Sequence, residues 1–160
     1  LGMEKLYKVV KDYVNPNKDM NVLDLYCGTG TIGIYLSNYV KEVFGVEINK
    51  YAVKDAINNA NLNDISNIKF VCADAKDVIS NYKNIDVAII DPPRAGLSKE
   101  AIKDLIKLNS KKIVYVSCDP ITLARDINIL KEFYDLDEIT LVDMFPNTYH
   151  VESVCVLNRK

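Results

Sequence analysis

Short apolar runs alternate with helical patterns along most of this chain, and this alternation constrains its fold more than any other feature. Runs typical of buried strands occur at Val22–Tyr26, Val43–Glu47, Ile68–Cys72, Val87–Ile90 and Ile113–Ser117. Helical patterns separate them at Thr31–Tyr39, Lys50–Asn61, Lys99–Leu108 and Ile121–Glu132, with a weaker candidate at Asp77–Asn81. Strands that alternate with helices predict a parallel sheet covered by helices on both faces.

The two ends of the chain depart from this alternation. Apolar residues at helical spacing predict a leading helix over Met3–Val14, which Asn15–Asn17 ends. Near the other end, only a loop joins the β-rich stretches Ile139–Met144 and Ser153–Leu157, so we expect them to pair as an antiparallel hairpin. The prediction is an α/β domain over residues 1–160, with a leading helix and linker at 1–20 and a mostly parallel seven-stranded sheet.

Composition excludes several classes of protein. The formal net charge of −2 and the pI of about 5.4 are not those of a strongly basic nucleic-acid module. No apolar run approaches the roughly 20 residues of a membrane span. The four cysteines lie far apart, without a C-x-x-C pair, so we expect no metal site. We expect a cytoplasmic monomer that does not bind membranes.

A glycine-rich turn follows the first predicted strand, where parallel sheets bind their ligands. Gly28, Gly30 and Gly33 satisfy the pattern G-x-G-x-x-G, and Glu47 ends the next strand. Glycines let the backbone approach a ligand closely, and an acid at this offset can accept hydrogen bonds from ribose hydroxyls. The pattern predicts a cofactor that resembles a nucleotide.

The acids around this turn favour one cofactor over another. Asp24 lies in the strand itself, and a carboxylate there suits the amino group and sulfonium of S-adenosylmethionine better than a pyrophosphate. Asp74 follows the third strand, where it can accept a hydrogen bond from adenine or cap a helix. With the terminal hairpin, these residues favour the class I S-adenosylmethionine-dependent methyltransferase fold, which is Rossmann-like. An NAD-binding oxidoreductase domain is the alternative.

Two further turns carry candidate substrate residues. Asp91, Pro92 and Pro93 follow the fourth strand, and the prolines give a stiff wall that suits a planar base. Methyltransferases that modify adenine or cytosine amino groups carry an aromatic residue where this chain has Arg94. Methylation of an adenine or guanine amino group in RNA or DNA is thus a weaker alternative. Arg94 and Arg125 are two of only three arginines, and their planar forks suit a phosphate or a carboxylate.

A cysteine and a glutamate are the candidate catalytic residues. Cys118 follows the fifth strand, directly before Asp119 and Pro120, which are typical of a helix start. The helix dipole there favours a thiolate, although Cys27 also lies near a helix start. Glu152 lies at the edge of an apolar strand, where desolvation raises the pKa of a carboxyl toward the working range of a base.

Together these segments resemble the RNA 5-methyluridine methyltransferase family, which modifies uridines in tRNA and 23S ribosomal RNA. The matching stretches are DLYCGTGTIG, GVEI, DPPRAGL, YVSCDPITLARD and MFPNTYHVES, in the order of the family. The resemblance implies that Cys118 is the nucleophile and Glu152 the proton acceptor. It also implies that Tyr26, Thr31, Glu47, Asp74 and Asp91 line the S-adenosylmethionine site together with the glycine turn.

The chemistry of uracil explains why both catalytic residues are needed. Carbon 5 is too weak a nucleophile to take a methyl group directly, and addition of a thiolate at carbon 6 makes it enolate-like. A separate base then removes the proton from carbon 5.

The chain also departs from the family in two ways. Asp119 replaces the family's usual asparagine. We further expect the chain to be a catalytic domain without the family's N-terminal RNA-binding region.

Overall fold

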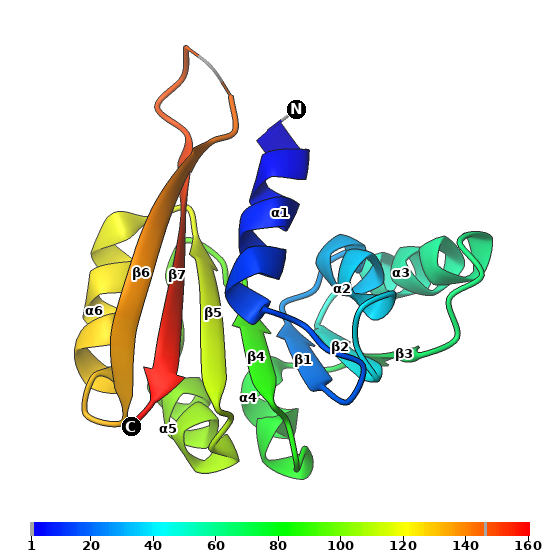
Figure 1. Ribbon diagram of the computed structural model, residues 1–160, viewed down its shortest axis with the longest axis horizontal. Coiled ribbons are helices and arrows are strands. Elements are labelled where there is room, and N and C mark those ends of the chain that lie inside the picture. Colours follow the sequence, from blue (N-terminus) through cyan, green and yellow to red (C-terminus); the bar gives the residue numbers. More distant parts are fainter. Residues whose placement is uncertain (1, 146) are drawn as a thin grey trace.

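The computed structural model describes residues 2–145 and 147–160 and shows a single sheet with helices on both faces (Figure 1). Leu1 of the leading segment and Pro146 of the last motif lie outside the described residues. The strands are β1 (Asn21–Leu25), β2 (Glu42–Glu47), β3 (Ile68–Cys72), β4 (Val87–Ile90), β5 (Lys112–Ser117), β6 (Tyr134–Asp143) and β7 (Val151–Arg159). The helices are α1 (Gly2–Val14), α2 (Thr31–Ser37), α3 (Lys50–Leu62), α4 (Ala75–Val78), a 3-10 turn η1 (Ile79–Asn81), α5 (Lys99–Leu108) and α6 (Pro120–Leu130).

The sheet has seven strands in the order β3-β2-β1-β4-β5-β7-β6. Strands β1 to β5 are parallel, and β7 runs antiparallel between β5 and β6. The predicted fold class and the terminal hairpin are therefore confirmed. The order reverses beside β1, so the carboxyl ends of β1 and β4 open a crevice there, which is where such sheets bind ligands.

The two strands of the terminal hairpin are longer than predicted: β7 extends the predicted Ser153–Leu157 by two residues at each end, and β6 begins five residues early. Strand β6 begins at Tyr134, whereas the apolar pattern begins only at Ile139. The stretch from Asp135 to Glu138 is exposed and acidic, and a register shift between Leu136 and Glu138 breaks the alternation. Edge strands with charged residues and a bulge lack the alternating signal from which strands are predicted.

Two apolar cores lie on opposite faces of the sheet. Residues of α1 and α2, among them Val10 and Leu36, form one core, and residues of α5 and α6, among them Leu105 and Leu130, form the other. Tyr115 of β5 is fully buried on the α6 side. The sheet is thus packed on both faces, and the turns at its carboxyl edge begin from buried strands.

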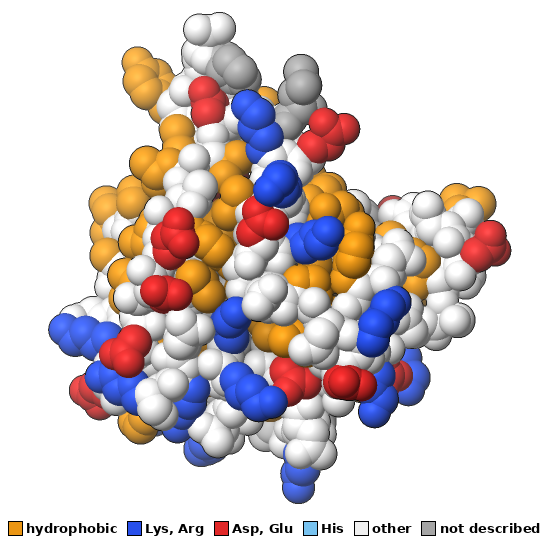
Figure 2. Space-filling model, in the orientation of Figure 1, with side chains coloured by type: hydrophobic (Ala, Val, Ile, Leu, Met, Phe, Trp, Pro, Cys, Tyr) orange, Lys and Arg blue, Asp and Glu red, His pale blue; other side chains and the backbone are white. Residues whose placement is uncertain are grey.

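The surface carries both signs of charge. Figure 2 shows lysine and arginine side chains interspersed with aspartate and glutamate on one face, in keeping with the net charge of −2. None of the helices within the described residues is long and apolar enough to cross a membrane. Those residues also contain no cluster of metal-binding side chains.

Candidate active site

The glycine turn after β1 has a backbone that few residues other than glycine adopt. Tyr26, Gly28 and Gly30 all have positive φ angles, of 60°, 55° and 78°. Glu47 fixes this turn from the end of β2, because its carboxylate accepts hydrogen bonds from the amides of Gly28, at 2.9 Å, and Asn49, at 3.0 Å. Glu47 thus contacts the glycine turn directly, and its predicted contact with ribose hydroxyls stays a prediction.

A cavity of about 490 Å³ opens beside this turn at the carboxyl edge of the sheet. Its lining includes the predicted cofactor residues Tyr26, Glu47, Asp74 and Asp91, together with Pro93 and Gly96. These residues come from the last position of β2 and from the turns after β1, β3 and β4. Four of the residues predicted to bind the cofactor thus meet in one hollow.

Negative charge gathers around the cavity. Burial and the nearby carboxylate of Asp91 raise the pKa of Asp24 to about 7. Burial and the charge of Glu152 raise the pKa of Asp91 to about 7. Part of the Asp91 surface is exposed, and water there screens the charge of Glu152. Within the described residues, no lysine or arginine forms an ion pair with Asp24, Asp91 or Glu47. A cationic ligand would relieve this repulsion.

Asp24 acts on the turn from beneath it. Its side chain is 1% exposed and accepts a hydrogen bond from the amide of Gly33, at 3.1 Å, near the start of α2. Gly33 leaves little room there, because a β-carbon at this position would lie 3.0 Å from the Asp24 carboxylate. The contact orients the first turn of the helix; a contact between Asp24 and a ligand stays a prediction.

Asp74 both caps a helix and lines the cavity. Its carboxylate caps α4 by accepting a hydrogen bond from the amide of Lys76, at 3.3 Å, and the side chain also lines the cavity. Tyr26 lines the same cavity, and burial raises the pKa of this phenol to about 12. The Tyr26 hydroxyl therefore stays protonated at neutral pH.

The sheet brings the two candidate catalytic residues together. Ser117 of β5 lies opposite Ser153 of β7, and the strands are antiparallel. Cys118 follows Ser117 and Glu152 precedes Ser153, so the register places both residues at the same end of the β5–β7 pair. Glu152 is half-buried, and burial raises its pKa. A carboxyl of this kind can accept a proton at neutral pH.

Burial distinguishes Cys118 from Cys27, which the sequence alone leaves open. Cys118 is exposed, and the hydrogen bonds between Ser117 and Asp119 hold the turn around it. Burial, together with the charges of Asp24 and Glu47, raises the pKa of the Cys27 thiol well above its usual range. Cys27 is therefore kept as a thiol, and Cys118 is the better candidate for an attacking thiolate.

Asp119 serves as the helix cap that the sequence predicts. Its carboxylate accepts hydrogen bonds from the amides of Ile121 and Thr122, both at 2.9 Å, at the start of α6. The hydrogen bond from Thr122 is the largest cause of the lowered pKa of Asp119, and the charge of Arg94 contributes. Arg94 is exposed, and its guanidinium has no ion-pair partner within the described residues. Arg94 is thus open to an external anion near Cys118.

Other predicted residues lie elsewhere than expected. Pro92 is buried, so Pro93 forms the cavity wall. Thr31 is exposed and lines a separate hollow with Tyr35. Arg125 donates to the carbonyls of Ala95 and Leu97, at 3.0 and 3.1 Å, and pairs with the buried Asp126. The guanidinium of Arg125 thus binds groups of the protein itself. The contact of Arg125 with substrate and the contact of Thr31 with the cofactor stay predictions.

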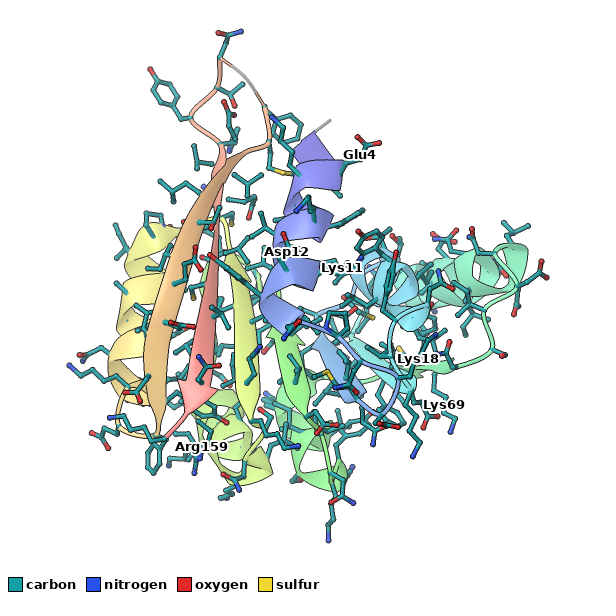
Figure 3. The ribbon with its side chains drawn as sticks, viewed as in Figure 1. Glu4, Lys11, Asp12, Lys18, Lys69 and Arg159 are labelled. Atoms are coloured by element: carbon teal, nitrogen blue, oxygen red, sulfur yellow. The ribbon has the colours of Figure 1, made fainter. Side chains whose placement is uncertain are left out.

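The third arginine lies away from this region. Arg159 is at the end of β7, opposite the hairpin tip that carries the loop before Glu152 (Figure 3). Its guanidinium lies over the ring of Tyr134, 5.0 Å from the ring centre. Only Arg94 and Arg125 therefore belong to the carboxyl edge of the sheet.

A sequence profile described as tRNA (Uracil-5-)-methyltransferase matches residues 3–160. An uncharacterized RNA methyltransferase of Staphylococcus epidermidis is 47% identical over 161 residues, a match that covers 98% of this chain and 35% of that protein. A similar protein of Staphylococcus aureus is 45% identical over 161 residues, covering 98% and 36%. The chain therefore spans about a third of the length of these relatives.

Solved structures agree with the sequence comparison. The Pyrococcus abyssi tRNA (uracil-54, C5)-methyltransferase, in complex with S-adenosyl-L-homocysteine, superposes with a TM-score of 0.83 at 39% identity, covering 94% of this chain and 37% of that one. The N-methyltransferase NodS of Bradyrhizobium japonicum has a TM-score of 0.83 at 14% identity, covering 99% and 96%. The second likeness shows the fold alone, which is that of class I S-adenosylmethionine-dependent methyltransferases.

Proposed function

This chain belongs to the tRNA (uracil-5-)-methyltransferase family, and we propose that it methylates carbon 5 of a uridine in tRNA or ribosomal RNA. The methyl donor in this proposal is S-adenosylmethionine. The observation that carries the proposal is the β5–β7 register, which puts Cys118 and Glu152 at the same end of the strand pair. Glu152 acts there on Asp91, which lines the cavity with Glu47, and neither of these two acids has a basic partner among the described residues. A carbon-5 methyltransferase needs these two features together.

The residues around the cavity fit the methyl donor. Its amino group and sulfonium are cationic, and Asp24, Glu47 and Asp91 supply negative charge without a basic partner among the described residues. Tyr26 and Pro93 supply flat surfaces for an adenine, and Asp74 supplies an acceptor for its amino group. The same acids would repel the pyrophosphate of NAD, which disfavours an oxidoreductase.

In the proposed reaction, Cys118 adds to carbon 6 of uracil as a thiolate. The S–C6 bond forms, and the electrons of the C5–C6 double bond move toward oxygen 4, which gives carbon 5 the nucleophilicity that uracil lacks. When bound, S-adenosylmethionine supplies the methyl group that carbon 5 takes. Glu152 then removes the proton from carbon 5, the C5–C6 double bond re-forms, and the thiolate leaves.

Variants of the two candidate catalytic residues, Glu152 and Cys118, test the proposal. We expect Glu152→Gln to form a covalent complex with uridine-containing RNA and to release it slowly, because the proton on carbon 5 has no acceptor. Cys118→Ala is expected to form no complex and no 5-methyluridine, as measured by nucleoside mass spectrometry. A matched Cys72→Ala variant removes another exposed cysteine and should react normally. Methylation by Cys118→Ala at the normal rate would show that this mechanism is wrong.

A further inference from the structure

One face of α6 binds the backbone of the turn after β4. Thr122, Arg125 and Asp126 lie three and four residues apart and so share one side of the helix. The Thr122 hydroxyl donates to the carbonyl of Arg94, at 3.0 Å, and Arg125 donates to the carbonyls of Ala95 and Leu97. Residues 94–97 are therefore attached to the helix that begins next to Cys118.

Asp126 lies at the centre of these contacts. Its side chain has no exposed surface, and its Oδ2 atom accepts hydrogen bonds from the amide of Leu97, at 2.8 Å, and the hydroxyl of Tyr115, at 2.6 Å. Its Oδ1 atom accepts from Nε and Nη2 of Arg125, at 2.9 and 2.7 Å. Both oxygens are used within the protein, so this carboxylate does not reach a ligand.

The helix and the turn are packed tightly against each other at Gly96. Gly96 has a φ of 74°, and a β-carbon added there would lie 2.6 Å from Nη2 of Arg125 and 2.7 Å from Oδ2 of Asp126. A side chain at this position would therefore displace the turn from α6. Asp126 is completely buried, whereas the Arg125 side chain is 50% exposed. A buried carboxylate adds little stability compared with an apolar residue of similar size, so stability alone does not account for Asp126.

The two segments that Asp126 joins each carry part of the site. The turn contains Asp91 and Pro93, which line the cavity, and α6 begins two residues after Cys118. Building on the proposed function, we propose that Asp126 is a positioning residue that fixes Cys118 relative to the cavity wall at Asp91 and Pro93. The methyl donor and the carbon-6 nucleophile must meet the same base, so their spacing controls the rate.

The test compares Asp126→Leu and Asp126→Asn with Leu130→Ala. Leu130 is a buried residue at the end of the same helix whose apolar side chain forms no hydrogen bond to the turn, so its variant controls for lost stability. A small misplacement at a reacting centre costs about 100-fold in rate, and we expect a loss of kcat of that order in Asp126→Leu. Asp126→Asn keeps an oxygen for Leu97 and Tyr115 and should recover part of the rate. In both Asp126 variants, the KM for RNA and the Kd of S-adenosylhomocysteine, measured by calorimetry, should stay within about twofold of the values of the unmodified protein.

Each outcome separates this inference from the function on which it rests. If kcat in Asp126→Leu falls no further than in a Leu130→Ala variant of the same Tm, the positioning role is wrong and the function stands. The same conclusion follows if Asp126→Leu and Asp126→Asn lose cofactor affinity in proportion to kcat. If neither this chain nor a longer form of the protein that includes an RNA-binding region forms 5-methyluridine with tRNA or ribosomal RNA, both the function and this inference are wrong.

Discussion

Asp24 joins the stability of this protein to its cofactor site. Its pKa of about 7 lies above the ordinary value of 3.8, so the folded state holds an extra proton between about pH 4 and 7. The free energy of unfolding therefore falls as pH rises through this window and stays lower above it. Ionised Asp24 lowers the free energy of unfolding, and a cationic ligand bound nearby would offset this loss.

Asp24→Asn should make the protein more stable and its cofactor site weaker. An amide oxygen can still accept from Gly33, and the buried charge is gone, so we expect a gain of about 1–4 kcal/mol at pH 8. The slope between pH 4 and 7 should flatten in urea titrations. Asp86→Asn is the control, because Asp86 pairs with Lys111 and has a lowered pKa, so that its stabilisation is lost as pH falls. A less stable Asp24→Asn protein at pH 8 would contradict this account.

Two glycines with positive φ offer a matched comparison of strain and crowding. A β-carbon at Gly28 would meet no atom within 4 Å, whereas one at Gly96 would meet Arg125 and Asp126. Gly28→Ala should therefore cost only the left-handed backbone, roughly 1 kcal/mol. Gly96→Ala adds crowding and should cost about 2–4 kcal/mol in all, measured by denaturant unfolding. Equal losses would show that the turn is not tightly fitted to α6.

At the scale of elements, α6 depends on its cap. Asp119 accepts two backbone hydrogen bonds there, and the sequence predicts this from the order of Asp119 and Pro120. Asp119→Asn should keep the Tm nearly unchanged, since asparagine caps as well as aspartate. Asp119→Ala should lower the Tm at pH 7, and the difference should shrink as pH falls through the lowered pKa of Asp119. A Tm that Asp119→Ala does not change would contradict the cap.

The elements themselves were largely predictable, because strands buried on both faces read as continuous apolar runs. Strands β2 to β5 agree with their predicted bounds to within one residue. The start of β6 was missed, since an exposed edge strand with a bulge has no such run. The positions of Thr31 and Arg125 were beyond prediction for another reason. Which side chain faces a cavity depends on contacts between α6 and the turn after β4, and spacing does not encode these contacts.

Asp126 is a functional candidate that sequence reasoning missed. It follows Arg125 within a matched motif, but an aspartate inside a helix ordinarily reads as an exposed polar residue. Only its complete burial and its bond to Leu97 distinguish it. The one signal in the sequence was its place four residues after Thr122, on a helix that begins two residues after Cys118.

At the scale of the whole molecule, charge gathers where the cavity lies. Asp24 and Asp91 both have pKa values of about 7, so more of the cavity charge is present at pH 8 than at pH 6. The affinity for S-adenosylhomocysteine, which keeps the amino group, should rise about three- to tenfold between these pH values. Adenosine lacks that cation and should show no such rise in calorimetry. A flat profile for both ligands would mean that the carboxylates do not bind the amino group.

The central claim is that Cys118 forms a covalent bond to the base. RNA that contains 5-fluorouridine has no proton on carbon 5 for Glu152 to remove, so with S-adenosylmethionine the methylated adduct should persist. The measurement is peptide mapping of that adduct by mass spectrometry on the protein and on Cys118→Ala. The account predicts a crosslink at Cys118 that the variant lacks. A crosslink at another residue, or one that survives in Cys118→Ala, would contradict it.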